Sequence, residues 1–217
     1  MATLKEIATA AEKADKAGNT KDSKTLVDLY FRMMKNSKID VKTFLKEGKQ
    51  IASELYQDYS FDTPQQQEDY KTIVKFWKGK GYNNYAIAGI VGNLDHESGN
   101  TFDYKKEQSS GGPGRGIAQM EKGAMFDRYN SWLKTSKQED SLLGQLNYIH
   151  GAIEDNLGFN ELGSGNAKKL REGLKNVESV KEATTMMQNI FFKPGKPNSD
   201  RRIELSNRAY KELNGNK

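Results

Sequence analysis

Hydrophobic and polar positions follow a helical period over most of the chain. Between residues 4 and 56, three segments carry apolar residues three and four positions apart, which is the spacing of an amphipathic helix. Gly18 can end the first segment and Thr20 can open the second, so we expect these two to form a helical hairpin. A stretch with one proline and three glutamines follows at residues 60–67 and indicates a boundary or linker.

The pattern after this boundary is again mostly helical, with one interruption. A helical face that includes Ile73 begins near Glu68, and residues 85–98 form a strongly apolar helix opened by Asn83 or Asn84 as N-cap. The helical period is lost between residues 99 and 119, where short alternating pieces and several glycines indicate a small β-hairpin. Further helices are predicted near residues 122–134, 139–155, 177–192 and 199–213.

These elements define the expected architecture. The fold class is α+β and predominantly helical, with one small strand-bearing insertion. At 217 residues the chain suits one domain with a small appendage. We therefore predict a helical N-terminal appendage over residues 1–64 and a main domain over residues 65–217.

Composition removes several kinds of site. The chain has no cysteine, which excludes disulfides, thiolate metal sites and a cysteine nucleophile, and two histidines are too few for an imidazole cage. We expect no metal and no cofactor. A formal charge of +5 and a pI near 9.1 favour polyanionic partners without choosing among nucleic acid, anionic lipid and acidic cell wall. No window is apolar enough to span a bilayer, and the charged start of the chain is unlike a secretory signal.

One carboxylate is aimed inward at the end of the apolar helix. Glu97 lies three residues after Leu94 and continues the buried stripe of residues 87–94. Partial burial disfavours the charged form of a carboxyl group and raises its pKa, as a general acid near neutral pH requires. Asp95 lies about 200° away around the helix and should face a different environment.

Two glycines within the same helix predict close packing. Gly89 and Gly92 each cost on the order of 1 kcal/mol relative to alanine inside a helix. A neighbouring helix that approaches closely would offset this cost. The segment is therefore expected to be the central helix of the domain, with Gly99 ending it.

Three blocks of sequence occur in a fixed order. Residues 88–99 read Ala-Gly-Ile-Val-Gly-Asn-Leu-Asp-His-Glu-Ser-Gly, residues 116–119 read Gly-Ile-Ala-Gln, and residues 192–197 read Phe-Lys-Pro-Gly-Lys-Pro, with Arg201 and Arg202 downstream. Over about residues 70–210 the chain resembles the phage tail lysozyme family, a branch of the goose-type lysozyme and lytic transglycosylase superfamily.

The resemblance implies a lysozyme-like fold and cleavage of the β-1,4 bond between N-acetylmuramic acid and N-acetylglucosamine in peptidoglycan. It assigns Glu97 as the general acid of a muramidase or lytic transglycosylase. The substrate-binding residues that it implies are Ser98, Gly116, Ile117, Ala118, Gln119, Gln145 and Tyr148. Two departures stand out, because family members carry tryptophan at the position of Met120 and glutamate at that of Ala152. An aromatic sugar platform and a helper carboxylate are therefore in doubt.

The sequence does not identify the second catalytic group that a glycosidase uses. A carboxylate that stabilises or attacks the oxocarbenium centre could come from Asp103, Glu107 or Glu121, in or beside the hairpin, although loop carboxylates are usually only solvated. Enzymes of the resembled superfamily can also work with one glutamate, so both hydrolysis and anhydro-sugar formation stay possible. His96 diverges from Glu97 by about 100° on a helix, and a structural role is expected for it and for His150.

The expected partner is the glycan strand of peptidoglycan, with no nucleic acid and no membrane span. Without a secretory signal, we expect a phage-encoded protein that travels in the virion, in the tail or as an ejected protein, and acts in the cell wall or periplasm. Residues 1–64 would contact other virion proteins. The alternative is a non-catalytic cell-wall-binding or structural virion protein, since residues 14–20 resemble hairpin segments of virion and ejection proteins. Nucleic-acid binding is supported only by charge.

Overall fold

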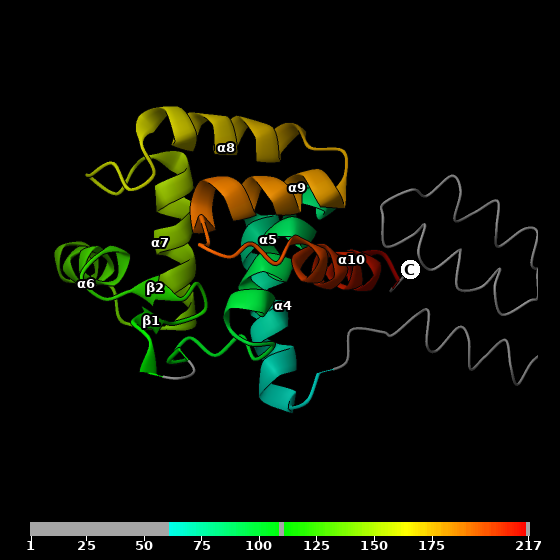
Figure 1. Cartoon of the computed structure of the whole chain (residues 1–217), viewed down its shortest axis with the longest axis horizontal. Helices are drawn as coiled ribbons and strands as arrows, with labels where there is room; N and C mark the ends of the chain where they lie inside the picture. The colour runs from blue at the N-terminus through cyan, green and yellow to red at the C-terminus, as the bar shows by residue number, and fades with distance from the viewer. Residues whose placement is uncertain (1–60, 109–110, 216–217) are drawn as a thin grey trace, which may run out of the picture. The chain divides into compact units, whose positions relative to one another are not determined.

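The computed structural model describes residues 61–108 and 111–215, which belong to one compact unit of the chain, residues 59–217 (Figure 1). The helices expected between residues 4 and 56, and with them all but the last four residues of the predicted N-terminal appendage, lie outside the described residues. Within the described residues, no helix combines the length and the apolar character needed to cross a membrane.

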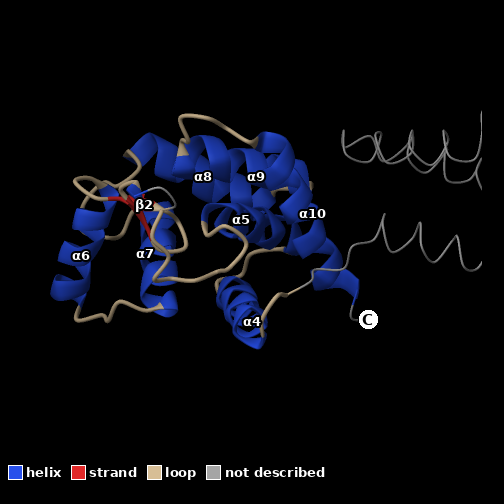
Figure 2. Ribbon diagram, turned by 60° about the horizontal axis from the view of Figure 1, so that its bottom comes forward, coloured by secondary structure: helices blue, strands red, loops and turns tan. Residues whose placement is uncertain are grey.

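The described unit is built mainly from helices, with one small sheet (Figure 2). The helices are α4 (Pro64–Gly79), α5 (Asn84–Glu97), α6 (Met125–Ser136), α7 (Leu142–Glu154), α8 (Ser164–Asn176), α9 (Val180–Met186), the π-helix η2 (Met187–Phe192) and α10 (Ser199–Gly215). Strands β1 (Gly114–Arg115) and β2 (Met120–Glu121) pair antiparallel, with Gly114 opposite Glu121 and Arg115 opposite Met120. The predicted α+β, predominantly helical class is confirmed.

Helix α5 is the central helix of this unit, because α4, α9 and α10 all pack against it (Figure 1). Its two internal glycines allow two of these contacts. A Cβ atom added to Gly89 would lie 2.5 Å from Cβ of Ala183 in α9, and one added to Gly92 would lie 2.6 Å from Cα of Ser206 in α10. The close approach that the glycines predicted is thus confirmed, toward both α9 and α10.

The start of α4 corrects the predicted linker. Thr63 is the N-cap, its hydroxyl accepts a hydrogen bond from the backbone N–H of Gln66, and Pro64 fills the first helical turn. The helix therefore begins at residue 64 and not near Glu68. Proline and glutamines that indicated a linker are compatible with a helix start, because proline at the first position loses no helical hydrogen bond. Of the two N-caps predicted for α5, Asn83 is the one that the structure shows, since its side chain accepts a hydrogen bond from the backbone N–H of Ala86.

Two further elements differ from the prediction. The hairpin lies at the C-terminal end of the interrupted region, with β2 just beyond residue 119, while residues 99–108 form an irregular loop joined to β1 by a single bridge between Glu107 and Arg115. Helix α8 was not predicted at all. Its buried residues Ala167, Leu170 and Leu174 have helical spacing, but glycines and charged residues surround them.

Candidate active site

The site is built around Glu97, the last residue of α5. Its side chain is 16 % exposed, so the carboxyl group does not project freely into water. The burial predicted from the apolar stripe is confirmed in this respect. Burial raises the pKa of the Glu97 carboxyl, while the neighbouring Arg202 guanidinium opposes part of that rise. Glu97 is therefore easier to protonate than an ordinary exposed glutamate.

Arg202 of α10 is the direct partner of Glu97. Its Nη2 donates a hydrogen bond to Oε1 of Glu97 at 2.5 Å, and its Nη1 donates to Oδ1 of Asn93 at 2.9 Å. Asn93 and Glu97 lie one helical turn apart on α5, so one guanidinium bridges both. The arginine side chain is 2 % exposed, and Phe192 of η2 lies against it, with its ring centre 5.6 Å from Cζ.

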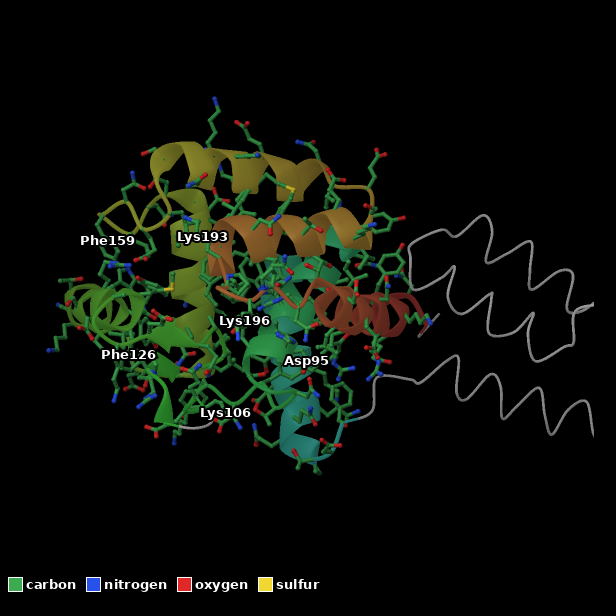
Figure 3. The ribbon with its side chains drawn as sticks, in the orientation of Figure 1. Asp95, Lys106, Phe126, Phe159, Lys193 and Lys196 are labelled. Atoms are coloured by element: carbon green, nitrogen blue, oxygen red, sulfur yellow. The ribbon has the colours of Figure 1, made fainter. Side chains whose placement is uncertain are left out.

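Asp95 belongs to a different environment, as its position on the helix predicted. The residue is 2 % exposed and lies in the last turn of α5 (Figure 3). The pKa of Tyr70 in α4 is raised by burial first, then by the charge of Glu212, and then by the charge of Asp95. Asp95 is thus buried, whereas Glu97 keeps part of its side chain exposed and pairs with Arg202 of α10.

The residue after the helix shapes the loop that follows. Ser98 is fully buried, its hydroxyl accepts a hydrogen bond from the backbone N–H of Phe102 at 2.9 Å, and the same hydroxyl donates to the Asp95 carbonyl. Gly99 has a φ of +66°, which favours glycine, and turns the chain away from the helix axis. Ser98 therefore fixes the loop that follows Glu97 through hydrogen bonds on its buried side.

The Gly116–Gln119 segment is held by Gln145 of α7. The amide oxygen of Gln145 accepts a hydrogen bond from the backbone N–H of Ile117 at 2.9 Å, and its amide nitrogen donates to the Tyr104 carbonyl at 2.7 Å. Gly116 has a φ of +75°, and a Cβ atom there would overlap the Gln145 amide. Gln145 thus ties the hairpin to the loop that precedes it.

The predicted substrate-binding residues differ in their access to solvent. Gln119 is partly exposed, has a φ of +46°, and its amide nitrogen donates to the Gly116 carbonyl at 3.0 Å. The others are all buried and are Ser98, Gly116, Ile117, Ala118, Gln145 and Tyr148. The Tyr148 hydroxyl donates to Glu161, a buried carboxylate that also pairs with Arg128.

The three candidate second carboxylates all lie at the surface. The Asp103 carboxylate accepts a hydrogen bond from the backbone N–H of Lys105 at 2.8 Å. Glu107 is 72 % exposed and pairs with Arg115 at 3.2 Å. Glu121 is exposed in β2. Glu97 itself pairs with Arg202, and none of these three carboxylates shares that hydrogen bond.

The two departures from the family pattern fall in the protein core. Met120 is 1 % exposed and Ala152 is 2 % exposed. Since Met120 packs inside the domain, it is not a surface position at which a sugar could stack. Of the two histidines, His150 packs against Trp77 and Phe76, which fits the structural role expected for it.

Sequence reasoning did not identify Arg202 and Asn93 as site residues. A signal for Arg202 was present, because it shares one helical face with Leu205 and Ala209, which are buried. An arginine on an apolar stripe needs a buried partner. The identity of that partner, 105 residues away in sequence, could not be read from a helical pattern.

A central helix that ends in a half-buried glutamate, followed by a loop and a short hairpin, is the arrangement of a lysozyme-like domain. A family model for phage tail lysozyme matches residues 68–213, and the chain belongs to the phage tail lysozyme family. The resemblance noted in the sequence is thereby confirmed, and the family indicates a lysozyme-like action on peptidoglycan. No curated protein matches the chain.

Proposed function

We propose that this domain is a glycosidase that cleaves the β-1,4 bond between N-acetylmuramic acid and N-acetylglucosamine, with Glu97 as general acid. The observation that carries the proposal is the burial of Glu97 at the end of the central helix, which raises the pKa of its carboxyl group. A group that stays protonated above the usual range of glutamate can deliver a proton to a glycosidic oxygen.

The reaction begins with transfer of the Glu97 proton to the oxygen that links the two sugars. The bond between that oxygen and the anomeric carbon breaks, its electron pair goes to the oxygen, and positive charge develops on the sugar ring. The oxygen of water, or of a hydroxyl of the same sugar, then forms a bond to the anomeric carbon and gives its proton to the Glu97 carboxylate, which completes hydrolysis or anhydro-sugar formation and restores the acid. Asp103, Glu107 and Glu121 remain candidates for the group that stabilises this charge.

Gln119 is the predicted residue best suited to touch the sugar directly, because it is partly exposed beside the hairpin. The buried residues hold the backbone of the predicted site in place. Gln145 holds the backbone of Ile117, Ser98 holds the loop after Glu97, and Tyr148 anchors Glu161. We propose that Gly116 and Ala118 contribute backbone groups to substrate binding.

The test compares wild type with Glu97→Gln on purified sacculi. The variant is expected to lose at least about 100-fold in rate, because a general acid contributes this much or more. Glu172→Gln on α8, an exposed glutamate, is the matched control and should retain activity. Equal rates in the wild type and Glu97→Gln would remove Glu97 from the mechanism. Mass spectrometry of the products distinguishes reducing ends from anhydro ends.

The second candidate function is binding to cell wall without cleavage. The ion pair between Glu97 and Arg202 favours it, since a paired carboxylate can also be purely structural. A wild-type protein that sediments with sacculi but releases no soluble fragments would support this candidate.

We also propose that the protein is carried in a phage virion and that residues 1–64 form a separate appendage that contacts other virion proteins. Membership of the phage tail lysozyme family supports the association with phage. Protein mass spectrometry of purified virions tests the location. Co-purification of virion proteins with the full chain, and its loss in a chain that starts at residue 59, tests the role of the appendage.

A further inference from the structure

The Arg202 guanidinium is positioned by a second residue, Asn93, in addition to its contact with Glu97. The amide nitrogen of Asn93 donates to the carbonyl of Gly89 at 2.8 Å and to that of Thr184 in α9 at 3.1 Å. These two bonds use both N–H groups, so the Asn93 amide oxygen must face Arg202. The guanidinium is thereby fixed by α5 and α9 together, and its remaining arm is directed at Glu97.

A purely structural role gives a poor account of this arginine. It is 2 % exposed, and its Nε has no hydrogen-bond partner within the described part of the chain. A buried donor without a partner costs stability, and buried ion pairs often contribute less than apolar packing of equal volume. Such a costly group suggests that its contact with Glu97 serves the reaction.

The contact involves only one of the two carboxyl oxygens. The carbonyl oxygen of a neutral carboxyl group is a stronger hydrogen-bond acceptor than its hydroxyl oxygen, and the oxygen that Nη2 of Arg202 contacts is Oε1. This contact therefore favours the form of neutral Glu97 that carries its proton on Oε2. When this proton leaves for the glycosidic oxygen, negative charge develops on both oxygens and strengthens the hydrogen bond to Oε1.

We propose that Arg202 is a positioning residue, which confines the transferable proton of Glu97 to Oε2 and stabilises the carboxylate that remains after proton transfer. The proposal rests on the proposed function of Glu97. An interaction that becomes stronger as the reaction proceeds lowers the barrier, whereas an equally strong interaction before and after would not. The proton moves from Oε2 to the leaving oxygen, and Arg202 keeps its own protons throughout.

Other charged groups near this site come from several elements. Arg201 precedes Arg202 on α10, and His96 precedes Glu97 on α5. Burial, then Arg202 and Arg201, lower the pKa of His96 to about 4, so this imidazole is neutral near pH 7. Lys106 of the following loop lies against Gly99, and Lys193 and Lys196 lie on the segment between η2 and α10 (Figure 3). These cations remain when Arg202 is replaced.

The experiment uses Arg202→Met, Arg202→Lys and the control Arg201→Met in the full chain. Arg201→Met removes a neighbouring charge that pairs with Glu204 and not with Glu97. Arg202→Met is expected to lose on the order of 100-fold in maximal rate on sacculi. The alkaline limb of its pH profile should move to higher pH, because the Glu97 carboxylate loses its stabilising partner. Arg202→Lys should recover part of the rate, and Arg201→Met should resemble the wild type.

Direct titration of Glu97 by carbon-13 NMR provides a readout that does not depend on activity. The pKa of Glu97 should be higher in Arg202→Met than in Arg201→Met. An unchanged pKa, or an active Arg202→Met with the rate and pH profile of Arg201→Met, would overturn the proposal. A wild type that cleaves no sacculi would overturn the proposed function and the catalytic part of this inference. In that case a higher pKa of Glu97 in Arg202→Met would show only that the two side chains are paired in solution.

Discussion

The side-chain amide oxygen of Gln145 accepts a hydrogen bond from the backbone N–H of Ile117 at 2.9 Å, across the 28 residues that separate them. Through this contact α7 fixes the segment that leads from β1 to β2. The Gln145 amide nitrogen binds the Tyr104 carbonyl in the loop that follows Glu97. One buried side chain therefore sets the distance between two loops of the candidate site.

Replacement of Gln145 by Leu should loosen both loops. Two backbone groups lose their partner in a buried place, and we expect a loss of about 1–3 kcal/mol in the free energy of unfolding. Activity on sacculi should fall further than the folded fraction does. Urea unfolding and initial cleavage rates measure the two effects. Gln138→Leu, at an exposed glutamine, is the control, and equal stability in both variants would contradict the role of Gln145.

Gly92→Ala should be strongly destabilising. The added methyl group would lie 2.6 Å from Cα of Ser206, and a backbone atom cannot move away cheaply. We expect a loss of about 2–3 kcal/mol, seen as a lower midpoint of thermal unfolding. Gly165→Ala in α8 has no atom within 4 Å of the new methyl group and should gain up to about 1 kcal/mol. A tolerated Gly92→Ala would mean that α5 and α10 are less closely packed in solution.

Stability should fall when the solution becomes acidic because of His96. Burial, Arg202 and Arg201 lower its folded pKa to about 4, below the ordinary histidine value of 6.5. The unfolded chain then binds more protons between these two values, so stability is lost as pH falls from about 6.5 to about 4. Because the residue is half-exposed, the loss should be on the order of 1 kcal/mol.

Urea unfolding of wild type and His96→Gln at pH 7 and pH 4.5 tests this pH dependence. The wild type should lose more stability between the two conditions than the variant. A matched change in both proteins would assign the acid sensitivity to other groups.

Loss of the ion pair between Arg128 and the buried Glu161 should cost more stability than loss of the exposed pair between Lys71 and Glu68. Its side chain is 1 % exposed and it depends on Arg128, which donates from Nε at 2.8 Å and from Nη2 at 2.6 Å. Arg128→Leu should cost about 3 kcal/mol, because Glu161 then keeps only the Tyr148 hydroxyl. Lys71→Leu, in an exposed pair with Glu68, should cost no more than about 0.5 kcal/mol. Similar losses in thermal unfolding experiments would argue against burial as the decisive factor.

Those parts of the fold that depend on local spacing could be predicted from the sequence. The apolar run that ends at Glu97 predicted a central helix, an N-cap at Asn83 or Asn84, and the inward direction of the glutamate. Gly89 and Gly92 specified close neighbours without naming them. Helix α8 was not predicted, because its buried face has only three apolar positions and these lie among Gly165, Gly173 and a run of charged residues.

The parts that depend on contacts between distant segments could not be predicted. Arg202 and Gln145 occur in patterns that suit many roles, and their partners are set by how α10 and α7 pack. The position of β2 was missed for a similar reason, since a strand of two residues has no period to detect. Met120 shows the same limit, because a departure from the family pattern in a sugar-binding motif proved to be a core residue.

The 105-residue separation of Glu97 and Arg202 has a consequence for biosynthesis. A ribosome that adds about 5–20 residues per second completes α5 some 5–20 s before it reaches α10. During this interval the nascent chain has the glutamate but not the arginine that will face it. Since α10 is the last of the described helices to be translated, the environment of Glu97 can be completed only after α10 has been synthesised.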